Sequence, residues 1–477
     1  MDALEDDCLC MSQAWITATN RRTSEILADH EERLQIANEL GAFASFDLAR
    51  VRHAAQAFDL LAQSSPEARP LLRGAIVAVK DVVAVAGMPM RAGSRATSTE
   101  EASRDATVVN QLRAEGALIV GKTSTDEFAL GSTTRGAANP HDRSRIPGGS
   151  SGGSAITVAV GGAHLAIGTD TGGSVRLPAI LCGVFGLKPT IGRISTSGVL
   201  PLSPSLDTVG LFARCVNDLR IALDSLVAPG TVMLPHQGRY PDPPVTPFTT
   251  DPLPGLWPSS ASVMQVGVIE LEDWVEPIDS TTWSCYLSAV ETLKERGSST
   301  FRVHLPDMKQ APSVLMDILL PEFAHWMDQT RSFGLDSELC GVEVVSELHR
   351  GRRMSAVSYL RALHRKRELA SAWGETLRSL DAIVIPATPR GATKRGEDVM
   401  RWDPGFEESV ESCFGRFTCA PSLAGFPVLA APWGTDGEGL PVGVQLIAKP
   451  YDEWAVLQLG GMLHPTAIPV IPNGGRR

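Results

Sequence analysis

Two glycine- and serine-rich segments carry the residues best suited to nucleophilic chemistry. Pro147-Gly-Gly-Ser-Ser-Gly-Gly-Ser154 holds three serines among four glycines, and Gly168-Thr-Asp-Thr-Gly-Gly-Ser-Val-Arg-Leu-Pro178 places a serine directly after a glycine pair. A serine hydroxyl attacks a carbonyl only when a base removes its proton. A lone Gly-Gly-Ser is usually a turn, but two such segments in succession direct attention to a serine nucleophile and its base.

The first segment also fits a second catalytic pattern. Gly149-Ser-Ser-Gly-Gly153 matches the G-x-S-x-G nucleophile elbow, which would make Ser151 the nucleophile. That elbow follows a strand directly, whereas Arg145-Ile-Pro-Gly148 precedes this segment. None of the ten histidines has a companion signature that would supply the base. The context therefore argues against a histidine triad.

A third motif suggests nucleotide binding. Gly116-Ala-Leu-Ile-Val-Gly-Lys-Thr123 satisfies the phosphate-loop pattern G-x-x-x-x-G-K-[ST]. The pattern works when a glycine-rich loop after a strand points its N–H groups at phosphates. Here the four central residues themselves form an apolar run typical of a buried strand, so we expect no nucleotide site.

With a third segment, Cys182-Gly-Val-Phe-Gly-Leu-Lys-Pro-Thr190, the two serine-rich segments resemble the signature of the amidase signature family. Members of that family cleave amide and related C–N bonds with a Ser, Ser, Lys triad. The resemblance is strong over residues 70–215, looser over 380–450 and almost absent over 216–350. It implies a hydrolase that acts on an amide, a carbamate or a urea derivative, with no metal and no organic cofactor.

Carried over position by position, the resemblance assigns three catalytic roles. It implies that Ser174 is the nucleophile, Ser150 the bridging serine and Lys80 the base, with Ser150 relaying protons in both halves of an acyl-enzyme reaction. It also implies a cis peptide bond between Gly149 and Ser150.

The assigned base makes physical sense only if it loses its proton at neutral pH. A free lysine is protonated there and cannot accept a proton. Lys80 ends the apolar run Ala75-Ile-Val-Ala-Val79, which suits a strand buried on both faces. Burial there could lower the pKa of Lys80 by roughly 2 to 4 units, so we expect a neutral amine.

The loop around the nucleophile offers stabilising groups. Two glycines let successive N–H groups turn toward one point, which predicts an oxyanion hole from the backbone of Thr171, Gly172, Gly173 and Ser174.

Three further residues are expected to support the loops. We expect Asp170 and Arg176 to brace the nucleophile loop with charge-assisted hydrogen bonds, and Ser151 to satisfy backbone groups at the start of the following helix.

The elements that position these residues alternate between strand and helix, which favours an α/β fold with a largely parallel sheet. Together with the resemblance, the pattern predicts an α/β/α sandwich around a large, mostly parallel mixed sheet. Short apolar runs predict strands, the later ones completing the same sheet, at 75–79, 117–120, 165–167, 381–386, 427–432 and 442–447.

The chain is expected to consist of a short N-terminal segment and one large domain. Residues 1–65 show helical spacing and predict a helical lead-in packed on the core. Residues 66–477 are expected to form one catalytic domain, in which 216–350 is a variable substrate-side region.

Composition excludes several classes of protein. A net charge of −11 provides no positive field for nucleic acid or an anionic membrane, and no apolar stretch reaches the roughly 20 residues of a membrane span. Eight irregularly spaced cysteines and an acidic N-terminus without an apolar segment favour a reducing cytoplasm. We expect a small-molecule substrate, and the chain could form a homodimer.

Two alternatives remain open. The chain could resemble the glutamine-hydrolysing subunit of an amidotransferase, which works with a partner chain, but the resemblance then implies an acidic glutamine anchor where Gly415-Arg416 stand before Phe417. It could also be an inactive binding relative, although all three triad positions are filled. A basic cluster, Arg361, Arg365, Lys366 and Arg367, could grip a substrate carboxylate, but such runs are more often a solvated helix face.

Overall fold

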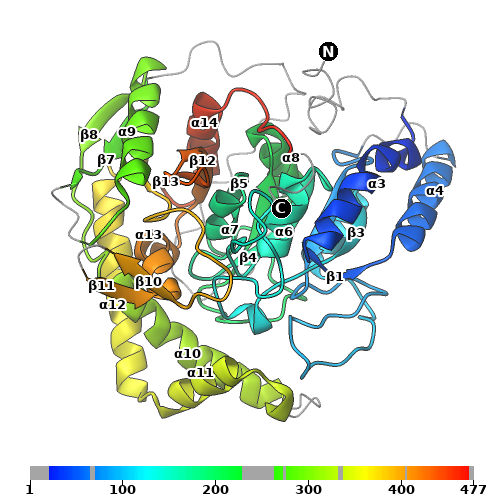
Figure 1. Cartoon of the computed structure of the whole chain (residues 1–477), viewed down its shortest axis with the longest axis horizontal. Helices are drawn as coiled ribbons and strands as arrows, with labels where there is room; N and C mark the ends of the chain where they lie inside the picture. Colours follow the sequence, from blue (N-terminus) through cyan, green and yellow to red (C-terminus); the bar gives the residue numbers. More distant parts are fainter. Residues whose placement is uncertain are drawn as a thin grey trace.

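The computed structural model describes residues 21–64, 70–227, 263–271, 276–330, 337–402 and 405–471. Their elements form three layers, with a central sheet between two layers of helices (Figure 1). The predicted α/β/α sandwich is therefore confirmed.

The central sheet has eleven strands in the order β1-β3-β2-β4-β6-β5-β12-β13-β9-β7-β8. In that order their bounds are Phe43–Phe46, Leu118–Thr123, Ile76–Lys80, Leu165–Asp170, Thr208–Ala213, Phe185–Lys188, Val428–Thr435, Pro441–Ala448, Ala382–Pro386, Gln265–Val268 and Ser299–Arg302. A separate hairpin joins β10 (Val399–Trp402) to β11 (Phe406–Ser409). All six strands predicted from apolar runs are present.

The prediction of a mostly parallel sheet is wrong. Parallel pairs occur only toward the two ends, at β3-β2-β4 and β9-β7-β8, while six neighbouring pairs are antiparallel. The chain does run from β4 through a helix to a strand of the same direction, β5, but β6 inserts between them and pairs antiparallel with both. Alternating strands and helices do not reveal such an insertion.

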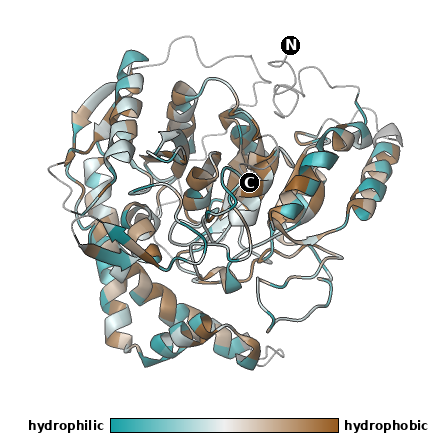
Figure 2. Cartoon of the chain, viewed as in Figure 1, coloured by the Kyte–Doolittle hydropathy of each residue, from teal (hydrophilic) through white to brown (hydrophobic). Residues whose placement is uncertain are grey.

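Helices cover both faces because strand side chains alternate in direction. Within β2, Val77 and Val79 join the cluster under one helical layer, and Ile76 and Ala78 join the cluster under the other. The first layer contains α5, α8, α9 and α14, and the second contains α3, α4, α6 and α7. Figure 2 shows apolar residues on the central elements and mixed polar and apolar residues on the outer helices.

The helices of the described residues have the following bounds: α3 Thr23–Glu39, α4 Leu48–Ser64, α5 Thr107–Ala114, α6 Gly152–Ala159, α7 Arg176–Leu181, α8 Val216–Leu226, α9 Ser280–Glu295, α10 Ala311–Thr330, α11 Val342–Arg353, α12 Ala356–Thr376, α13 Val410–Ala424 and α14 Glu453–Leu463. Two short 3₁₀ turns, η1 and η4, span Glu127–Ala129 and Ser337–Leu339. Among the described residues, no helix combines the length and the apolar character needed to cross a lipid bilayer.

The N-terminal segment contributes more than the predicted helices. Besides α3 and α4 it supplies β1, which pairs antiparallel with β3 at one edge of the sheet. Leu27 and Leu34 of α3 are buried in the same cluster as β2 and α6. The predicted boundary at residue 65 remains a prediction.

Candidate active site

Lys80 ends strand β2 with its side chain completely buried. Its Nζ lies 2.8 Å from Ser150 Oγ and 2.9 Å from Thr169 Oγ1. The alternation along β2 directs Lys80 toward the face that carries α6, where the loop with Ser150 begins that helix. The strand therefore brings the predicted base to the predicted bridging serine.

The surroundings of Lys80 favour its neutral form. Burial lowers the pKa of Lys80 from its ordinary 10.5 to about 7, although the nearby carboxyls of Asp126, Asp170 and Asp207 act in the opposite direction. A buried amine loses hydration that a charged ammonium needs. Near neutral pH, a substantial fraction of Lys80 can thus accept a proton.

Ser150 is completely buried and follows a cis peptide bond from Gly149, as expected. Gly149 has no room for a side chain, because a Cβ there would collide with Asp126 Oδ2 and the backbone of Thr133. The Asp126 carboxylate accepts hydrogen bonds from the N–H groups of Thr133 at 3.1 Å and Arg135 at 3.3 Å. Asp126 therefore fixes the loop that encloses Gly149.

Ser174 lies half-buried in the loop between β4 and α7. Its carbonyl accepts a hydrogen bond from the Ser151 N–H at 3.2 Å. This contact joins the two serine-rich loops one residue beyond Ser150. The residues that the sequence assigned to one site thus come from neighbouring segments of the structure.

Asp170 and Arg176 make charge-assisted hydrogen bonds beside the loop that carries Ser174. Both side chains are fully buried, and Arg176 donates to Asp170 through Nε at 3.0 Å and Nη2 at 2.9 Å. Asp170 also accepts from the N–H groups of Gly173 at 2.9 Å and Val175 at 3.1 Å. Burial alone would raise the pKa of Asp170, but the charge and hydrogen bonds of Arg176 outweigh it and lower that pKa to about 2.

The far side of Arg176 is anchored to two other elements. Its Nη1 donates to the carbonyl of Thr418 at 2.9 Å and to Gln445 Oε1 at 2.7 Å, and its Nη2 donates to Ser422 Oγ at 2.5 Å. Thr418 and Ser422 belong to α13, and Gln445 belongs to β13. The loop that carries Ser174 is thereby tied to the C-terminal part of the sheet.

The backbone of the predicted oxyanion hole is partly engaged. The Gly173 N–H donates to Asp170, so in this arrangement the predicted role falls to the N–H groups of Thr171, Gly172 and Ser174, and it stays a prediction. Gly173 has a φ of +137°, and a Cβ there would lie 2.6 Å from Thr418 Oγ1. Only glycine fits at that point.

The predicted role of Ser151 as a helix cap is wrong. Ser151 occupies the N-cap position of α6 without a side-chain capping bond. Its hydroxyl instead donates to the carbonyl of Thr169 in β4 at 3.2 Å. It supports the site by fastening the first serine-rich loop to the strand that leads to Ser174.

Several residues of the site were missed from the sequence. Thr169 contacts Lys80 directly, while Asp126 and Asp207 lie close enough for their charge to affect it. Asp207 accepts a hydrogen bond from the Thr171 hydroxyl at 2.6 Å. Thr169 stands within the second serine-rich segment and could have been found there, but the two aspartates carry no comparable signal.

Two other expectations concern sites away from Ser174. The phosphate-loop-like segment is strand β3, and Lys122 within it pairs with Asp81 at 2.8 Å in a buried ion pair, so its ammonium faces a carboxylate.

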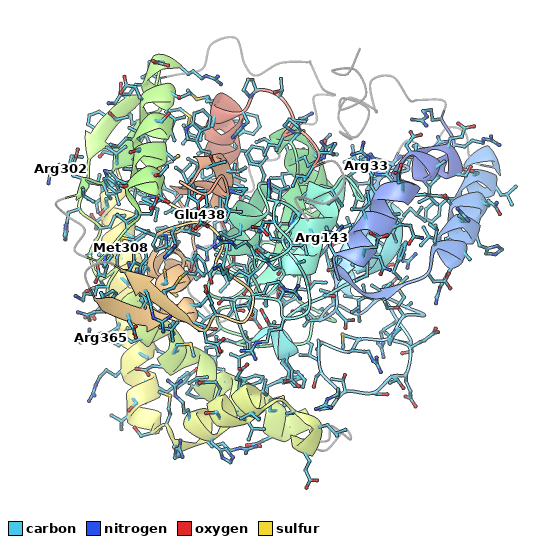
Figure 3. The ribbon with its side chains drawn as sticks, in the orientation of Figure 1. Arg33, Arg143, Arg302, Met308, Arg365 and Glu438 are labelled. Carbon is cyan, nitrogen blue, oxygen red and sulfur yellow. The ribbon has the colours of Figure 1, made fainter. Side chains whose placement is uncertain are left out.

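Of the basic cluster on α12, the three arginines are exposed, and Arg365 lies at the outer edge of the molecule (Figure 3). Lys366, in contrast, is buried and donates to the carbonyl of Ser205 at 2.7 Å. Among the described residues, histidine, cysteine and acidic side chains form no group of three that could hold a metal ion.

Comparisons with known proteins identify the family and the fold of this chain. A family model described as "Amidase" matches residues 25–457. A glutamyl-tRNA(Gln) amidotransferase subunit from Anaeromyxobacter sp. (strain K) is 35% identical over 471 residues, covering 92% of each chain. A crystal structure of an amidase superposes with a TM-score of 0.82 at 29% identity, covering 96% of this chain and 98% of the other. A glutamyl-tRNA(Gln) amidotransferase subunit from Thermotoga maritima superposes with a TM-score of 0.72 at 27% identity, covering 96% and 97%.

The fold is thus the amidase-signature α/β fold, with a mixed central sheet and two serine-rich loops beside a buried lysine. The chain belongs to the amidase family, a family of hydrolases.

Proposed function

We propose that this chain is a stand-alone amidase that hydrolyses a small amide, or a related carbamate or urea derivative, through an acyl-enzyme on Ser174. The observation that carries the proposal is the 2.8 Å contact between the buried Lys80 Nζ and Ser150 Oγ. It supports a proton path that needs neither a histidine nor a second charged group. The roles of all three residues are part of the proposal.

In the first half of the reaction, Ser174 Oγ attacks the substrate carbonyl carbon. Its proton passes to Ser150 Oγ while the Ser150 proton passes to the neutral Nζ of Lys80, which becomes an ammonium. The buried position of Lys80, with its pKa near 7, supports this transfer at neutral pH. N–H groups of the nucleophile loop then stabilise the negative carbonyl oxygen.

In the second half, the protons return by the same route. Lys80 gives its proton back through Ser150 to the departing nitrogen, and the C–N bond breaks to leave an ester on Ser174. Water attacks that ester as Lys80 again accepts a proton through Ser150. As the ester C–O bond breaks, Lys80 returns this proton through Ser150 to Ser174 Oγ. The product acid leaves, and Lys80 is neutral again.

The reaction is proposed to take place in a reducing compartment such as the cytoplasm. Six cysteines lie among the described residues, and none of them forms a disulfide: Cys182, Cys215, Cys285, Cys340, Cys413 and Cys419. A chain of this size in an oxidising compartment would more often carry disulfides.

The alternative, a glutamine-hydrolysing protein that works with a partner chain, is favoured by the sequence identity to amidotransferase subunits. The surroundings of Arg416 weigh against it. The guanidinium of Arg416 is held by Glu408, with Nε to Oε2 at 3.2 Å, and by the carbonyl of Pro277. This residue stands where an acidic glutamine anchor was expected, and its charge is already compensated within the protein.

The test is hydrolysis of a panel of aryl amides, aryl carbamates and glutamine by the purified chain, with ATP as a control for nucleotide turnover. We expect release of the aryl amine and little ammonia from glutamine, and Ser174→Ala should reduce turnover by at least about 10³-fold. Release of ammonia from glutamine, with no aryl amine released from the other substrates, would favour the amidotransferase alternative. Wild-type turnover by Ser174→Ala would overturn the proposal.

A further inference from the structure

We infer that Glu322 is a positioning residue that holds the nucleophile loop from outside, through Ser203, Asp207 and Thr171. The inference rests on the proposed function, since it assigns this residue to the same site. Glu322 lies on α10, which packs against α12 and α13 (Figure 1).

The inner end of this connection is the contact between Thr171 and Asp207. The Thr171 hydroxyl donates to Asp207 Oδ1 at 2.6 Å, and the other oxygen, Oδ2, accepts from the N–H groups of Leu202 at 2.9 Å and Ser203 at 3.0 Å. Asp207 therefore joins the loop 202–207 to the residue three positions before Ser174. A shift of that loop would move Thr171 with it.

The outer end is the carboxylate of Glu322. Its Oε2 accepts from the Ser203 hydroxyl at 2.7 Å and the Ser205 N–H at 3.0 Å, and its Oε1 accepts from the Tyr359 hydroxyl at 2.7 Å. Lys366 of α12 adds a hydrogen bond to the Ser205 carbonyl at 2.7 Å. The loop 202–207 is thus held between two helices on one side and the nucleophile loop on the other.

Ser203 makes a hydrogen bond to each of the two carboxylates, those of Asp207 and Glu322. Its N–H donates to Asp207 and its hydroxyl donates to Glu322, and it is completely buried. Removing the hydroxyl alone would break one of the two hydrogen bonds from the loop 202–207 to Glu322 of α10, leaving the Ser205 N–H bond to Glu322 and the contact with Asp207. Ser205 provides a matched control, because its own hydroxyl is buried and has no hydrogen-bond partner within the described part of the chain.

The experiment compares Ser203→Ala with Ser205→Ala by two readouts. The first is steady-state hydrolysis of the best amide from the panel. We expect Ser203→Ala to lower kcat about three- to tenfold with KM within about twofold, since a displaced oxyanion donor acts mainly on the transition state. Ser205→Ala should match the wild type in both constants.

The second readout needs no substrate: hydrogen–deuterium exchange of peptides that cover residues 165–177. We expect this region to exchange about threefold faster in Ser203→Ala, and at the wild-type rate in Ser205→Ala. If the wild type cleaves no amide, the proposed function fails, while the exchange comparison still decides the inference.

The inference would be overturned if Ser203→Ala had the same kcat or the same exchange rate as Ser205→Ala. It would also be overturned if Ser203→Ala changed KM alone. Should Ser203→Ala fail to fold, Tyr359→Phe removes the other hydroxyl on Glu322 and is judged by the same two readouts.

Discussion

Arg176 clamps Asp170 with two hydrogen bonds of 3.0 and 2.9 Å, and neither side chain is exposed to solvent. The two residues flank the loop that carries Ser174, since Asp170 ends β4 and Arg176 begins α7. Asp170 also holds two backbone N–H groups of that loop, so it fixes the conformation in which the serine is presented.

Asp170→Asn should destabilise the protein strongly, because it leaves the Arg176 guanidinium buried without a counter-charge. We expect the free energy of unfolding to fall by about 3 to 5 kcal/mol, measured by urea denaturation. Arg378→Ala, which breaks the exposed pair with Glu375, is the control and should cost less than about 1 kcal/mol. Similar losses of unfolding free energy in the two variants would contradict the larger contribution expected of the buried pair.

The pH dependence of hydrolysis should report Lys80. Because the neutral amine is the active form and its pKa is lowered to about 7 by burial, kcat/KM should rise with pH below 7 and level off above it. A profile from pH 5.5 to 9 on an aryl amide measures this, with circular dichroism as a control for folding. A flat profile, or a rise centred near the ordinary lysine value, would be incompatible with a neutral base at this position.

Acid should destabilise the fold through a buried histidine pair. His30 and His164 lie with ring centroids 4.4 Å apart; His30 Nδ1 donates to the Gly161 carbonyl, and His164 Nδ1 accepts from the Ile76 N–H. Burial lowers the pKa of His30 to about 4 and that of His164 well below its usual range.

The folded state therefore excludes protons that the unfolded chain binds below pH 6.5. The stability that the neutral rings provide is complete above pH 6.5 and declines as the pH falls toward 4, by about 3 kcal/mol for His30. His30→Gln should flatten the dependence of Tm on pH between 6.5 and 4.5, whereas His53→Gln, at an exposed position, should leave it unchanged. An identical slope in all three proteins would contradict this account.

Local sequence patterns were sufficient to predict six of the eleven strands of the central sheet and to single out the two serine-rich loops. Strand β2 is a continuous apolar run that ends at a lysine, and such a run has few alternatives to a buried strand. The order of the strands was not predictable in this way. β6 follows β5 in the chain but lies between β4 and β5 in the sheet, and no local pattern marks that order. β1 has only four residues, which is too short to interrupt the helical pattern of the N-terminal segment.

The polar partners of the site were the hardest to predict. Asp126 and Asp207 are distant from Lys80 in sequence and act on it only after folding. Ser151 was expected to cap α6, but the strand beside it offers a backbone carbonyl within reach. A buried hydroxyl bonds to whatever tertiary neighbour is available, and no local pattern encodes that choice.

The central claim is that Lys80, acting through Ser150, activates the hydroxyl of Ser174. The most direct measurement is labelling with a fluorophosphonate, which reacts with activated serines, followed by mass spectrometry of the modified peptide. The account predicts a single adduct on Ser174 in the wild type, formed at least about 10²-fold more slowly in Lys80→Ala and in Ser150→Ala. An adduct on another residue, or labelling of Lys80→Ala at the wild-type rate, would contradict it.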